Sequence, residues 1–432
     1  MTDNILNAPE GMKSYLPADA LKFEQIRENM AAVFRRWGYE PIVTPLLEYY
    51  DSLLAGMEER ARKQFYKLID YDGNVLALRP EMTAPIARTV VNRREELSLP
   101  LRLSYYAPVF RYDMPQTGKN REIYQMGLEF IGDSSFADAE VIITAVEAIK
   151  STGIKNFKID LGHVGYLKGI IEELQLSSSN ARRLKTFLHS KDFVGLRSFL
   201  QELKVDKTEL LQDIPLLRGD EKILERAKKM VTNRRSLQAV EKLKDIYSYL
   251  VSYQVAEYIN FDLSLIRGLN YYTGMIFEGF TEKLGYTICG GGRYDNLLGQ
   301  YGVEKIPAVG FAIGVQRLAL ALESLPKAEN NLDGLLVFSQ KSRKLALEWA
   351  RQLHQRNYRI IIEENGNDKE KYIDMAQNKG ADRVLFFDEQ YVTGKADETV
   401  DEQAKIMVLD MTDKSETIIE LKEGWDKKVW DR

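Results

Sequence analysis

The stretch Arg267–Glu278 reads RGLNYYTGMIFE, and Gly290–Leu298, which follows closely, reads GGGRYDNLL. Together they supply an arginine, two tyrosines and a run of glycines. Arginine presents a planar fork that matches a carboxylate, tyrosine combines an apolar ring with a polar tip, and glycine lets the backbone approach a ligand closely. This set of residues indicates a pocket for an amino acid, and we expect the three glycines to form a tight turn.

Length and composition set the limits for the rest of the chain. Its 432 residues are enough for two or three domains, and 44% hydrophobic with 29% charged residues is an ordinary globular composition. No apolar run approaches the roughly 18 residues of a membrane span. The N-terminal segment lacks the features of a signal peptide, so we expect a cytoplasmic protein. The single cysteine, Cys289, and three histidines indicate neither a disulfide nor a metal-ligand cluster.

Helical and strand patterns alternate before residue 162. Apolar residues recur at spacings of three and four from Leu21 to Trp37, which predicts an amphipathic helix that stops at Gly38. Alternating apolar residues bounded by turn residues predict two hairpins. The further expected elements are a hairpin over Tyr66–Leu78, a helix over Ala84–Asn92, a hairpin of Leu101–Asp113 with Glu122–Ile131, a helix over residues 137–150 and a strand at Lys155–Leu161.

The pattern changes between about Gly165 and Glu257. Strand signals vanish there, and charged residues interleave with Leu and Ile at helical spacing. We interpret this stretch as a helical insertion between two halves of one domain. After it, the expected elements are strands at Ile259–Leu265, Tyr272–Phe280 and Tyr286–Cys289 and a buried helical segment over Phe311–Leu322.

A polar linker, Pro326–Asp333, precedes a region in which strands and helices alternate, which predicts a small α/β domain. The expected elements are strands at Leu335–Phe338, Tyr358–Ile362 and Arg383–Phe387, helices at Ser342–Arg356 and Asp368–Asn378, and a polar loop over Tyr391–Ala404. The acidic excess of the chain, whose net charge is −4, lies after residue 330. Because a domain that grips RNA usually presents a basic face, this charge argues modestly against an RNA partner.

The two quoted segments, in this order, resemble the histidine-recognition signatures of the histidyl-tRNA synthetases and of their non-catalytic relatives, the regulatory subunits of ATP phosphoribosyltransferase. The resemblance implies an α+β fold, with a class II synthetase-like antiparallel sheet flanked by helices in residues 1–325 and the helical insertion at about 165–257. It also implies an α/β domain similar to an anticodon-binding domain in residues 333–432. The helix that ends at Gly38, followed by the proline-marked stretch YEPIVTPLLE, resembles the first class II motif, which implies a homodimer.

Candidate site residues come from the strand pattern and from the resemblance. Gln125 and Glu129 share one face of a strand, because side chains alternate with a period of two, whereas Tyr124 and Leu128 face the other way. Taken singly, each candidate is more simply a surface or core residue, and only their joint occurrence favours a site. The resemblance implies histidine-binding roles for Glu81, Thr83, Arg111, Gln125, Glu129, Arg267, Tyr271 and Tyr272, and it matches Arg317 to a nucleotide-contacting arginine.

Several positions depart from the synthetase pattern. Met82, in LRPEMT, stands where a synthetase usually has glycine, and it fills space beside a ligand-facing glutamate. Asp113 and Lys119 replace a glutamate and an arginine of the second class II motif, and lysine cannot grip a phosphate with two parallel hydrogen bonds. Gln316 replaces a glutamate, which removes a possible Mg²⁺ ligand, and Asn270 replaces an aspartate. Together these changes indicate that histidine recognition is kept and nucleotide chemistry is weakened.

This asymmetry favours a non-catalytic regulatory subunit of ATP phosphoribosyltransferase, which needs no cofactor. The resemblance implies a short catalytic subunit as partner in a hetero-oligomer that carries out the first step of histidine biosynthesis. Histidine would then act by linkage between two states of the assembly, with a coupling typically of about 1–3 kcal/mol. Neither a membrane nor tRNA is expected as a partner.

Two other interpretations remain open. An active histidine–tRNA ligase is supported by Arg111, Arg267 and Arg317 and by the presence of a C-terminal domain. A synthetase-like paralogue with another role, such as a stress-signalling RNA binder, would bind tRNA tightly and with a steep salt dependence.

Overall fold

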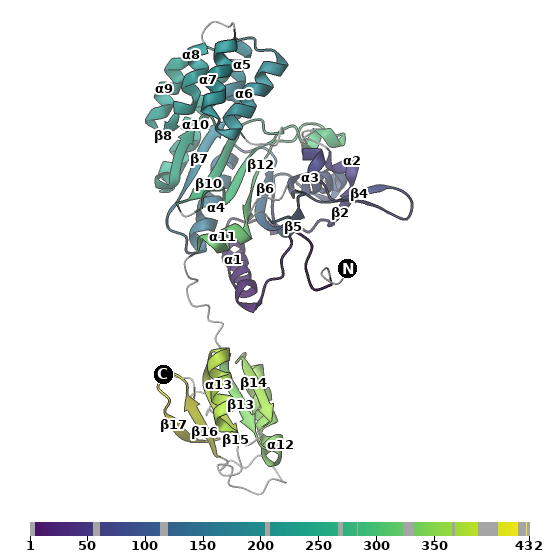
Figure 1. The fold of residues 1–432 in the computed structure, drawn as a ribbon, viewed down its shortest axis with the longest axis vertical. Helices are drawn as coiled ribbons and strands as arrows, with labels where there is room; N and C mark the ends of the chain where they lie inside the picture. The colour runs from purple at the N-terminus through teal and green to yellow at the C-terminus, as the bar shows by residue number, and fades with distance from the viewer. Residues whose placement is uncertain are drawn as a thin grey trace. The chain divides into compact units, whose positions relative to one another are not determined.

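The computed structural model describes residues 5–54, 61–112, 120–203, 208–266, 271–282, 284–322, 332–364, 368–387, 405–421 and 429. The chain divides into two compact units, Met1–Leu325 and Pro326–Arg432 (Figure 1). Within the described ranges, no helix combines the length and hydropathy needed to cross a bilayer.

A nine-stranded sheet forms the centre of the first unit, in the order β1-β5-β6-β12-β11-β10-β7-β9-β8 (Figure 1). Its neighbouring strands are antiparallel except for two parallel pairs, β1 with β5 and β7 with β9. This mainly antiparallel sheet, flanked by helices, confirms the predicted α+β class. The strands are β1 (Glu40–Pro41), β5 (Leu101–Phe110), β6 (Glu122–Ile131), β7 (Phe157–His163), β8 (Arg218–Gly219), β9 (Ile259–Asp262), β10 (Met275–Thr281), β11 (Cys289–Arg293) and β12 (Ala308–Gly314).

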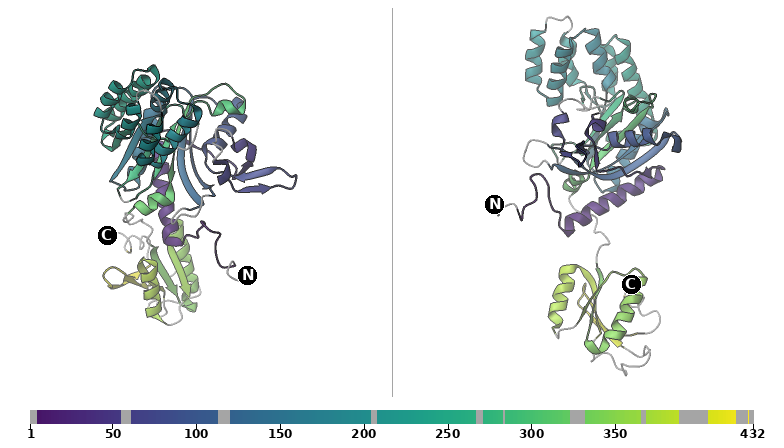
Figure 2. Two further views of the ribbon diagram at one scale, coloured as in Figure 1. Left: turned by 45° about the horizontal axis from the view of Figure 1, so that its top comes forward. Right: turned by 90° about the vertical axis from the view of Figure 1, so that its right-hand side faces the viewer.

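One face of this sheet is covered by α4 (Ala137–Ser151), and α4 packs in turn against α1 (Pro17–Arg36), which also contacts α11 (Val315–Ala321). The right-hand view of Figure 2 shows α1 as a long purple helix beside the sheet. The helix predicted over Leu21–Trp37 is confirmed, although it begins earlier, at Pro17, because proline is well suited to a first helical turn. Gly38, with φ +75°, follows its end, as expected for a C-terminal stop.

A second, small sheet has the order β2-β4-β3 and consists of β2 (Leu47–Tyr49), β3 (Lys67–Ile69) and β4 (Val75–Leu78). Strands β3 and β4 confirm the hairpin predicted over Tyr66–Leu78, and Gly73 takes a positive φ of +85° in its turn. Two helices follow these strands along the chain, α2 (Tyr50–Leu53) after β2 and α3 (Thr83–Asn92) after β4. Helix α3 packs Ile86 and Ala87 against the face of the main sheet that carries Tyr105.

The helical insertion is the teal cluster at one end of the sheet in Figure 1. Its helices are α5 (Val164–Glu173), α6 (Ser178–Ser190), α7 (Phe193–Glu202), α8 (Thr208–Asp213), α9 (Lys222–Met230) and α10 (Arg234–Ser252). Helix α10 packs against α5, α4 and β7. The two-residue strand β8, which the sequence pattern did not predict, joins the insertion to the edge of the sheet through β9.

The glycine run does not form the turn that we expected. Its residues lie in β11, in the middle of the sheet between β10 and β12. A Cβ atom at Gly291 would lie 2.2 Å from the carbonyl oxygen of Gly310 on β12, so the missing side chain serves close strand packing rather than a turn conformation. The strand predicted at Tyr286–Cys289 is correspondingly wrong in position, because β11 begins only at Cys289.

Two further expectations are corrected nearby. The strand predicted over Tyr272–Phe280 begins at Met275, so the two tyrosines precede β10. The helical segment predicted from Phe311 is a strand as far as Gly314, and only α11 after it is helical. A short apolar run does not distinguish a buried strand from a buried helix, which explains the second error.

The second unit is a five-stranded sheet, in the order β14-β13-β15-β16-β17, with a helix on each face (Figure 1). Helix α12 (Arg343–Gln355) buries Trp349 against one face, and α13 (Lys369–Lys379) buries Tyr372 against the other. The predicted alternation of strands and helices is confirmed, but β16 and β17 were not predicted, and the loop expected over Tyr391–Ala404 lies outside the described residues. The strands are β13 (Leu332–Phe338), β14 (Ile360–Glu364), β15 (Ala381–Phe387), β16 (Lys405–Asp410) and β17 (Glu416–Glu420).

Candidate amino-acid site

A cavity of about 180 Å³ lies in the first unit, on the side of the main sheet that faces the start of α3. Backbone of β11 and β12 contributes to its wall through Gly290 and Gly310. Of the predicted site residues, Glu129 lies behind this wall and Arg267 lies outside the described residues. The polar and aromatic residues that line the cavity include Glu81, Thr83, Tyr105, Arg111, Gln125, Tyr271, Tyr272, Tyr294 and Arg317.

The carboxylate of Glu81 lines the cavity and also caps α3. Its two oxygens accept hydrogen bonds from the backbone N–H groups of Thr83, at 2.6 Å, and Ala84, at 2.8 Å. These donors belong to the first turn of the helix, where no intrahelical acceptor is available. Burial raises the pKa of Glu81, because the loss of water outweighs both the backbone hydrogen bonds and the nearby guanidinium of Arg111. A cationic ligand beside Glu81 would favour its ionised form.

Glu129 is a second acid, one layer behind the cavity wall and only 1% exposed. Its carboxylate accepts hydrogen bonds from the hydroxyls of Thr83, at 2.8 Å, and Tyr294, both of which line the cavity. Burial, reinforced by the charge of Glu81, raises the pKa of Glu129 to about 8 despite these hydrogen bonds. The predicted alternation along β6 is observed, since Gln125 lines the cavity while Leu128 packs in the core on the other face.

Two arginines also line the cavity, and backbone carbonyls fix the orientation of both. Arg111 donates from Nε to the carbonyl oxygen of Pro80 at 2.8 Å. Arg317 donates from Nη1 to the carbonyl oxygen of Thr287 at 2.7 Å, and its guanidinium lies 5.1 Å from the ring centre of Tyr286. The cavity therefore presents both signs of charge, as a zwitterionic ligand requires.

A cluster of tyrosines forms the apolar part of the wall. The ring of Tyr271 lies 4.9 Å from that of Tyr272 and 5.6 Å from that of Tyr294. Burial raises the pKa of Tyr271, Tyr294 and Tyr105 well above the usual value for a phenol. Their hydroxyls therefore stay protonated and act as donors at neutral pH.

The structure also describes two of the residues at which the chain departs from the synthetase pattern. Met82 is 1% exposed and lines the cavity. Its backbone, at φ −105° and ψ −23°, has a conformation that residues other than glycine also adopt. The amide of Gln316 is engaged with β6, where it accepts from the backbone N–H of Tyr124 at 2.9 Å, and it is not among the lining residues. The remaining departures, Asp113, Lys119 and Asn270, lie outside the described residues.

The sequence interpretation missed Tyr105, Tyr294 and Gly310 as site residues. A signal existed for Tyr294, which stands within the quoted GGGRYDNLL segment, but the expectation of a turn left no strand to carry it towards the cavity. Tyr105 and Gly310 come from separate strands, and only the register of β5, β6 and β12 brings them to one wall.

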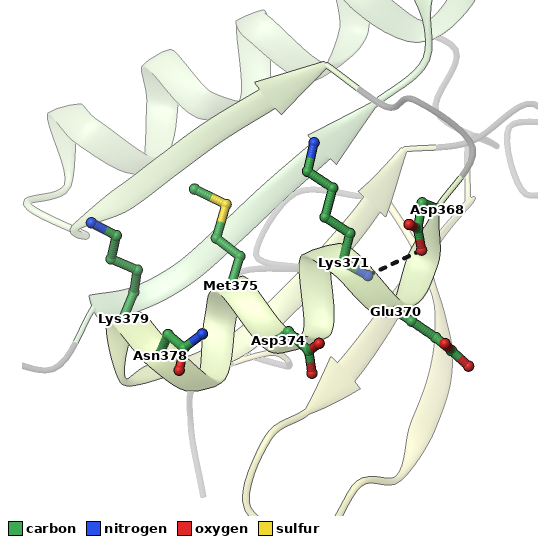
Figure 3. Close-up of a pocket in the computed structure, with 7 residues that line it drawn as sticks. All are labelled: Asp368, Glu370, Lys371, Asp374, Met375, Asn378 and Lys379. Atoms are coloured by element: carbon green, nitrogen blue, oxygen red, sulfur yellow. Dashed lines mark hydrogen bonds between the residues drawn. The ribbon is translucent and has the colours of Figure 1, made fainter.

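A larger hollow, of about 590 Å³, lies on α13 of the second unit (Figure 3). Figure 3 shows Lys371, Met375 and Lys379 leaving the helix on the same side. Asp368, at its start, is occupied as the cap that accepts from the backbone N–H of Lys371 at 3.1 Å. These side chains are mostly exposed, mixed in charge and carried by a single helix, so this hollow lacks the buried polar groups of a ligand site. No cluster of His, Cys, Asp or Glu in the described part of the chain is arranged to hold a metal ion.

Comparisons with known proteins identify relatives that match most of the chain. The histidyl-tRNA synthetase family matches residues 11–318. A protein named ATP phosphoribosyltransferase regulatory subunit from Halothermothrix orenii is 49% identical over 414 residues, which cover 95% of this chain and 98% of the relative. A protein of the same name from Desulforamulus reducens is 38% identical over 90% of this chain and 96% of the relative.

Two solved structures also resemble the chain over most of its length. A crystal structure of an ATP phosphoribosyltransferase regulatory subunit/histidyl-tRNA synthetase from Bacillus halodurans C is 33% identical, with a TM-score of 0.80, and the match covers 89% of this chain and 98% of that one. A histidyl-tRNA synthetase from a Nostoc species also reaches a TM-score of 0.80, over 98% of this chain and 99% of that one, but at 22% identity it shows the fold alone. The chain belongs to the family of ATP phosphoribosyltransferase regulatory subunits, which is built on the histidyl-tRNA synthetase fold.

Proposed function

We propose that this protein is a non-catalytic regulatory subunit that binds free histidine in the cavity of residues 1–325 and passes the signal to a catalytic ATP phosphoribosyltransferase subunit. The observation that carries the proposal is the joint presence of Glu81, Arg111 and the tyrosine pair in one buried cavity. The proposed histidine contacts, direct or through the wall, are Glu81, Thr83, Arg111, Gln125, Glu129, Arg267, Tyr271 and Tyr272.

The charges of the cavity match those of the ligand. Histidine presents a carboxylate, which a guanidinium binds well, and an ammonium group, which needs a carboxylate such as Glu81. A buried charge without such a partner costs several kcal/mol, so the pairing also selects against ligands that lack one of the two groups. The hydroxyl of Tyr294 donates its proton to the carboxylate of Glu129, which leaves the hydroxyl oxygen as an acceptor for an imidazole N–H.

The size of the cavity supports binding without chemistry. At about 180 Å³ it lies below the ~300–1,000 Å³ typical of pockets for drug-sized ligands, so it suits an amino acid better than an aminoacyl nucleotide. Met82 contributes to its wall, and the amide of Gln316 is occupied by the β6 backbone instead of being available to a metal-bound nucleotide. Arg317 remains on the wall as the remnant of a nucleotide site.

An exposed apolar surface supports self-association through the class II core. It includes the face of the small sheet that carries Tyr49, 60% exposed, Leu68, 44% exposed, and Leu47, 40% exposed, and the segment before β2, where Val43 is 92% exposed. Monomeric proteins rarely expose so many large apolar side chains together, which favours a second copy of this chain as the occupant. This homodimer would assemble with catalytic subunits into a hetero-oligomer in the cytoplasm.

Regulation then follows from linkage. If histidine binds one conformation of the assembly more tightly, it shifts the population towards that conformation, and feedback inhibition and activation of the partner reflect the same equilibrium. We therefore expect the catalytic subunit to be active only with this protein present and to be inhibited by histidine. An assay of the reconstituted complex with and without histidine tests the proposal, and a catalytic subunit that is equally active alone would refute it.

A second candidate, an active histidine–tRNA ligase, is favoured by one observation, the retention of Arg111 and Arg317 in the same cavity. A histidine-dependent exchange of pyrophosphate into ATP by the purified chain would support this alternative. The regulatory proposal expects no exchange above background, together with histidine binding in the same preparation.

A further inference from the structure

The helical insertion reaches the cavity through a network of polar contacts at the segment Tyr271–Thr273. This segment carries the two tyrosines of the wall and precedes β10, so no regular secondary structure holds it. The Nζ of Lys168 on α5 donates to the carbonyl oxygen of Tyr272 at 3.3 Å. The first residue of α5, Val164, donates from its backbone N–H to the carbonyl oxygen of Gly274 at 3.0 Å.

A second connection runs from α10 through buried ionic groups. Lys242 lies 3.6 Å from one carboxylate oxygen of Asp138 at the start of α4, and Nε of Arg293 donates to the other oxygen at 2.7 Å. Arg293 also donates to Asp295 at 3.1 Å, and Asp295 accepts from the hydroxyl of Thr273 at 2.8 Å. A path of contacts therefore links a lysine of the insertion to the residue that follows the two tyrosines.

The interior of this path is buried, whereas its end in the insertion is partly exposed. Asp138 is 1% exposed, and the side chain of Arg293 is 16% exposed. Burial alone would lower the pKa of Arg293, but the carboxylates of Asp138 and Asp295 outweigh burial and raise it, so the guanidinium stays charged. The side chain of Lys242 is 38% exposed, and its contact with Asp138 is the part of the path that opens if the insertion moves.

We propose that Lys168 and Lys242 are positioning residues for the cavity. Ligand binding in the cavity and packing of the helical insertion against the segment Tyr271–Thr273 would then favour each other. The inference rests on the proposed function only for the identity of the ligand. A ligand that packs against Tyr271 and Tyr272 orders the segment that the two lysines hold. Because such coupling is reciprocal, an insertion that is packed against this segment strengthens ligand binding by the same factor by which the ligand favours that packing.

Three substitutions separate this role from simple stabilisation. Lys242→Met and Lys168→Met each remove one connection, and Lys242→Arg keeps the charge. The matched control is Lys244→Met on the same helix, because Lys244 pairs with Glu225 at 2.6 Å within the insertion. We expect Lys242→Met and Lys168→Met to weaken histidine binding about fivefold, the scale of one partly exposed ion pair or one hydrogen bond from a charged donor. Lys242→Arg and Lys244→Met should stay within about twofold of the wild type, and all four should unfold at nearly the wild-type temperature.

Hydrogen exchange of the full chain without ligand supplies a readout that does not depend on histidine. We expect faster exchange in the Tyr271–Gly274 segment of Lys168→Met and Lys242→Met than in Lys244→Met, because the amide of Thr273 is held by the carbonyl of Arg293. Unchanged exchange in both variants would overturn the inference, as would wild-type histidine affinity in both. If the wild type bound no histidine, the proposed function would fall, and the exchange comparison would still decide whether the lysines hold this segment.

Discussion

Gly310 on β12 lies directly opposite Glu129 on β6, and a Cβ atom at position 310 would stand 1.8 Å from the carboxylate of Glu129. The buried acid therefore occupies the space that a side chain on the neighbouring strand would fill. This arrangement brings the carboxylate within reach of the hydroxyls of Thr83 and Tyr294 in the cavity wall.

Gly310→Ala should consequently displace Glu129 as well as strain β12. We expect a loss of about 1–3 kcal/mol in the free energy of unfolding, as for other overpacked sites, together with a loss of histidine binding. Urea unfolding and calorimetry measure the two effects. Gly285→Ala is the control, because its Cβ atom would meet nothing within 4 Å, and an equal response of the two variants would contradict this account.

Glu129 should make stability depend on pH. Its pKa is raised from 4.5 to about 8 in the folded protein, so the folded state keeps a proton that the unfolded chain releases between these values. The free energy of unfolding that Glu129 contributes is complete below about pH 4.5 and is lost as the pH rises to about 8. In Glu129→Gln this contribution is absent. The free energy of unfolding of the wild type, measured by urea unfolding across this window, should therefore fall relative to that of the variant as the pH rises, and a constant difference would count against the raised pKa.

Arg111 and Arg317 should differ in their importance for histidine. We expect Arg111→Lys to weaken histidine binding about tenfold, because lysine cannot offer a carboxylate two parallel hydrogen bonds. Arg317→Lys, at the proposed remnant of a nucleotide site, should remain within about twofold of the wild type. Calorimetric titration of both variants decides the matter, and equal losses would mean that the two arginines share the ligand carboxylate.

Glu81→Gln should separate the two tasks of this side chain. The glutamine keeps one oxygen that can accept from the first turn of α3, so the free energy of unfolding should fall by no more than about 1 kcal/mol. Histidine binding should fall at least tenfold, because the charge opposite the ammonium group is lost. Glu95→Gln, at an exposed position, should change neither quantity. Retained affinity in Glu81→Gln would remove Glu81 from the binding site.

Val43→Asp should disrupt the proposed homodimer. Val43 is 92% exposed beside the small sheet, and an aspartate there would place two like charges in or near a symmetric interface. We expect the variant to sediment as a monomer at concentrations at which the wild type is a dimer. Val194→Asp is the matched control, because Val194 is 81% exposed but lies in the helical insertion. A dimeric Val43→Asp variant would place the interface elsewhere.

Periodic patterns in the sequence were sufficient to predict the long elements and one face of the site. The apolar spacing before Trp37 gave α1, and the two-residue period of β6 put Gln125 on the cavity side. The same reasoning failed for β11, because a run of glycines carries no periodicity and is typical of turns. Its place in the sheet depends on the close approach of β12, for example at Gly291, which no local pattern encodes.

The parts of the site that the sequence did not predict depend on register between distant strands. Tyr105 and Gly310 lie about two hundred residues apart and meet only because β5, β6 and β12 pair in a particular alignment. The sequence also did not show that Glu81 both lines the cavity and caps α3. The backbone N–H groups that it accepts from can be identified only when the first residue of the helix is known.

The glycine strand has a consequence for how this cavity can change. Because the glycines of β11 let the neighbouring strands approach closely, a side chain at Gly291 would collide with β12 and one at Gly292 with β10. We therefore expect a shift in ligand preference to come from other residues of the wall, at positions such as Met82, Gln125 and Arg317. Random variants selected for a new ligand should collect their substitutions at such positions and leave these glycines unchanged.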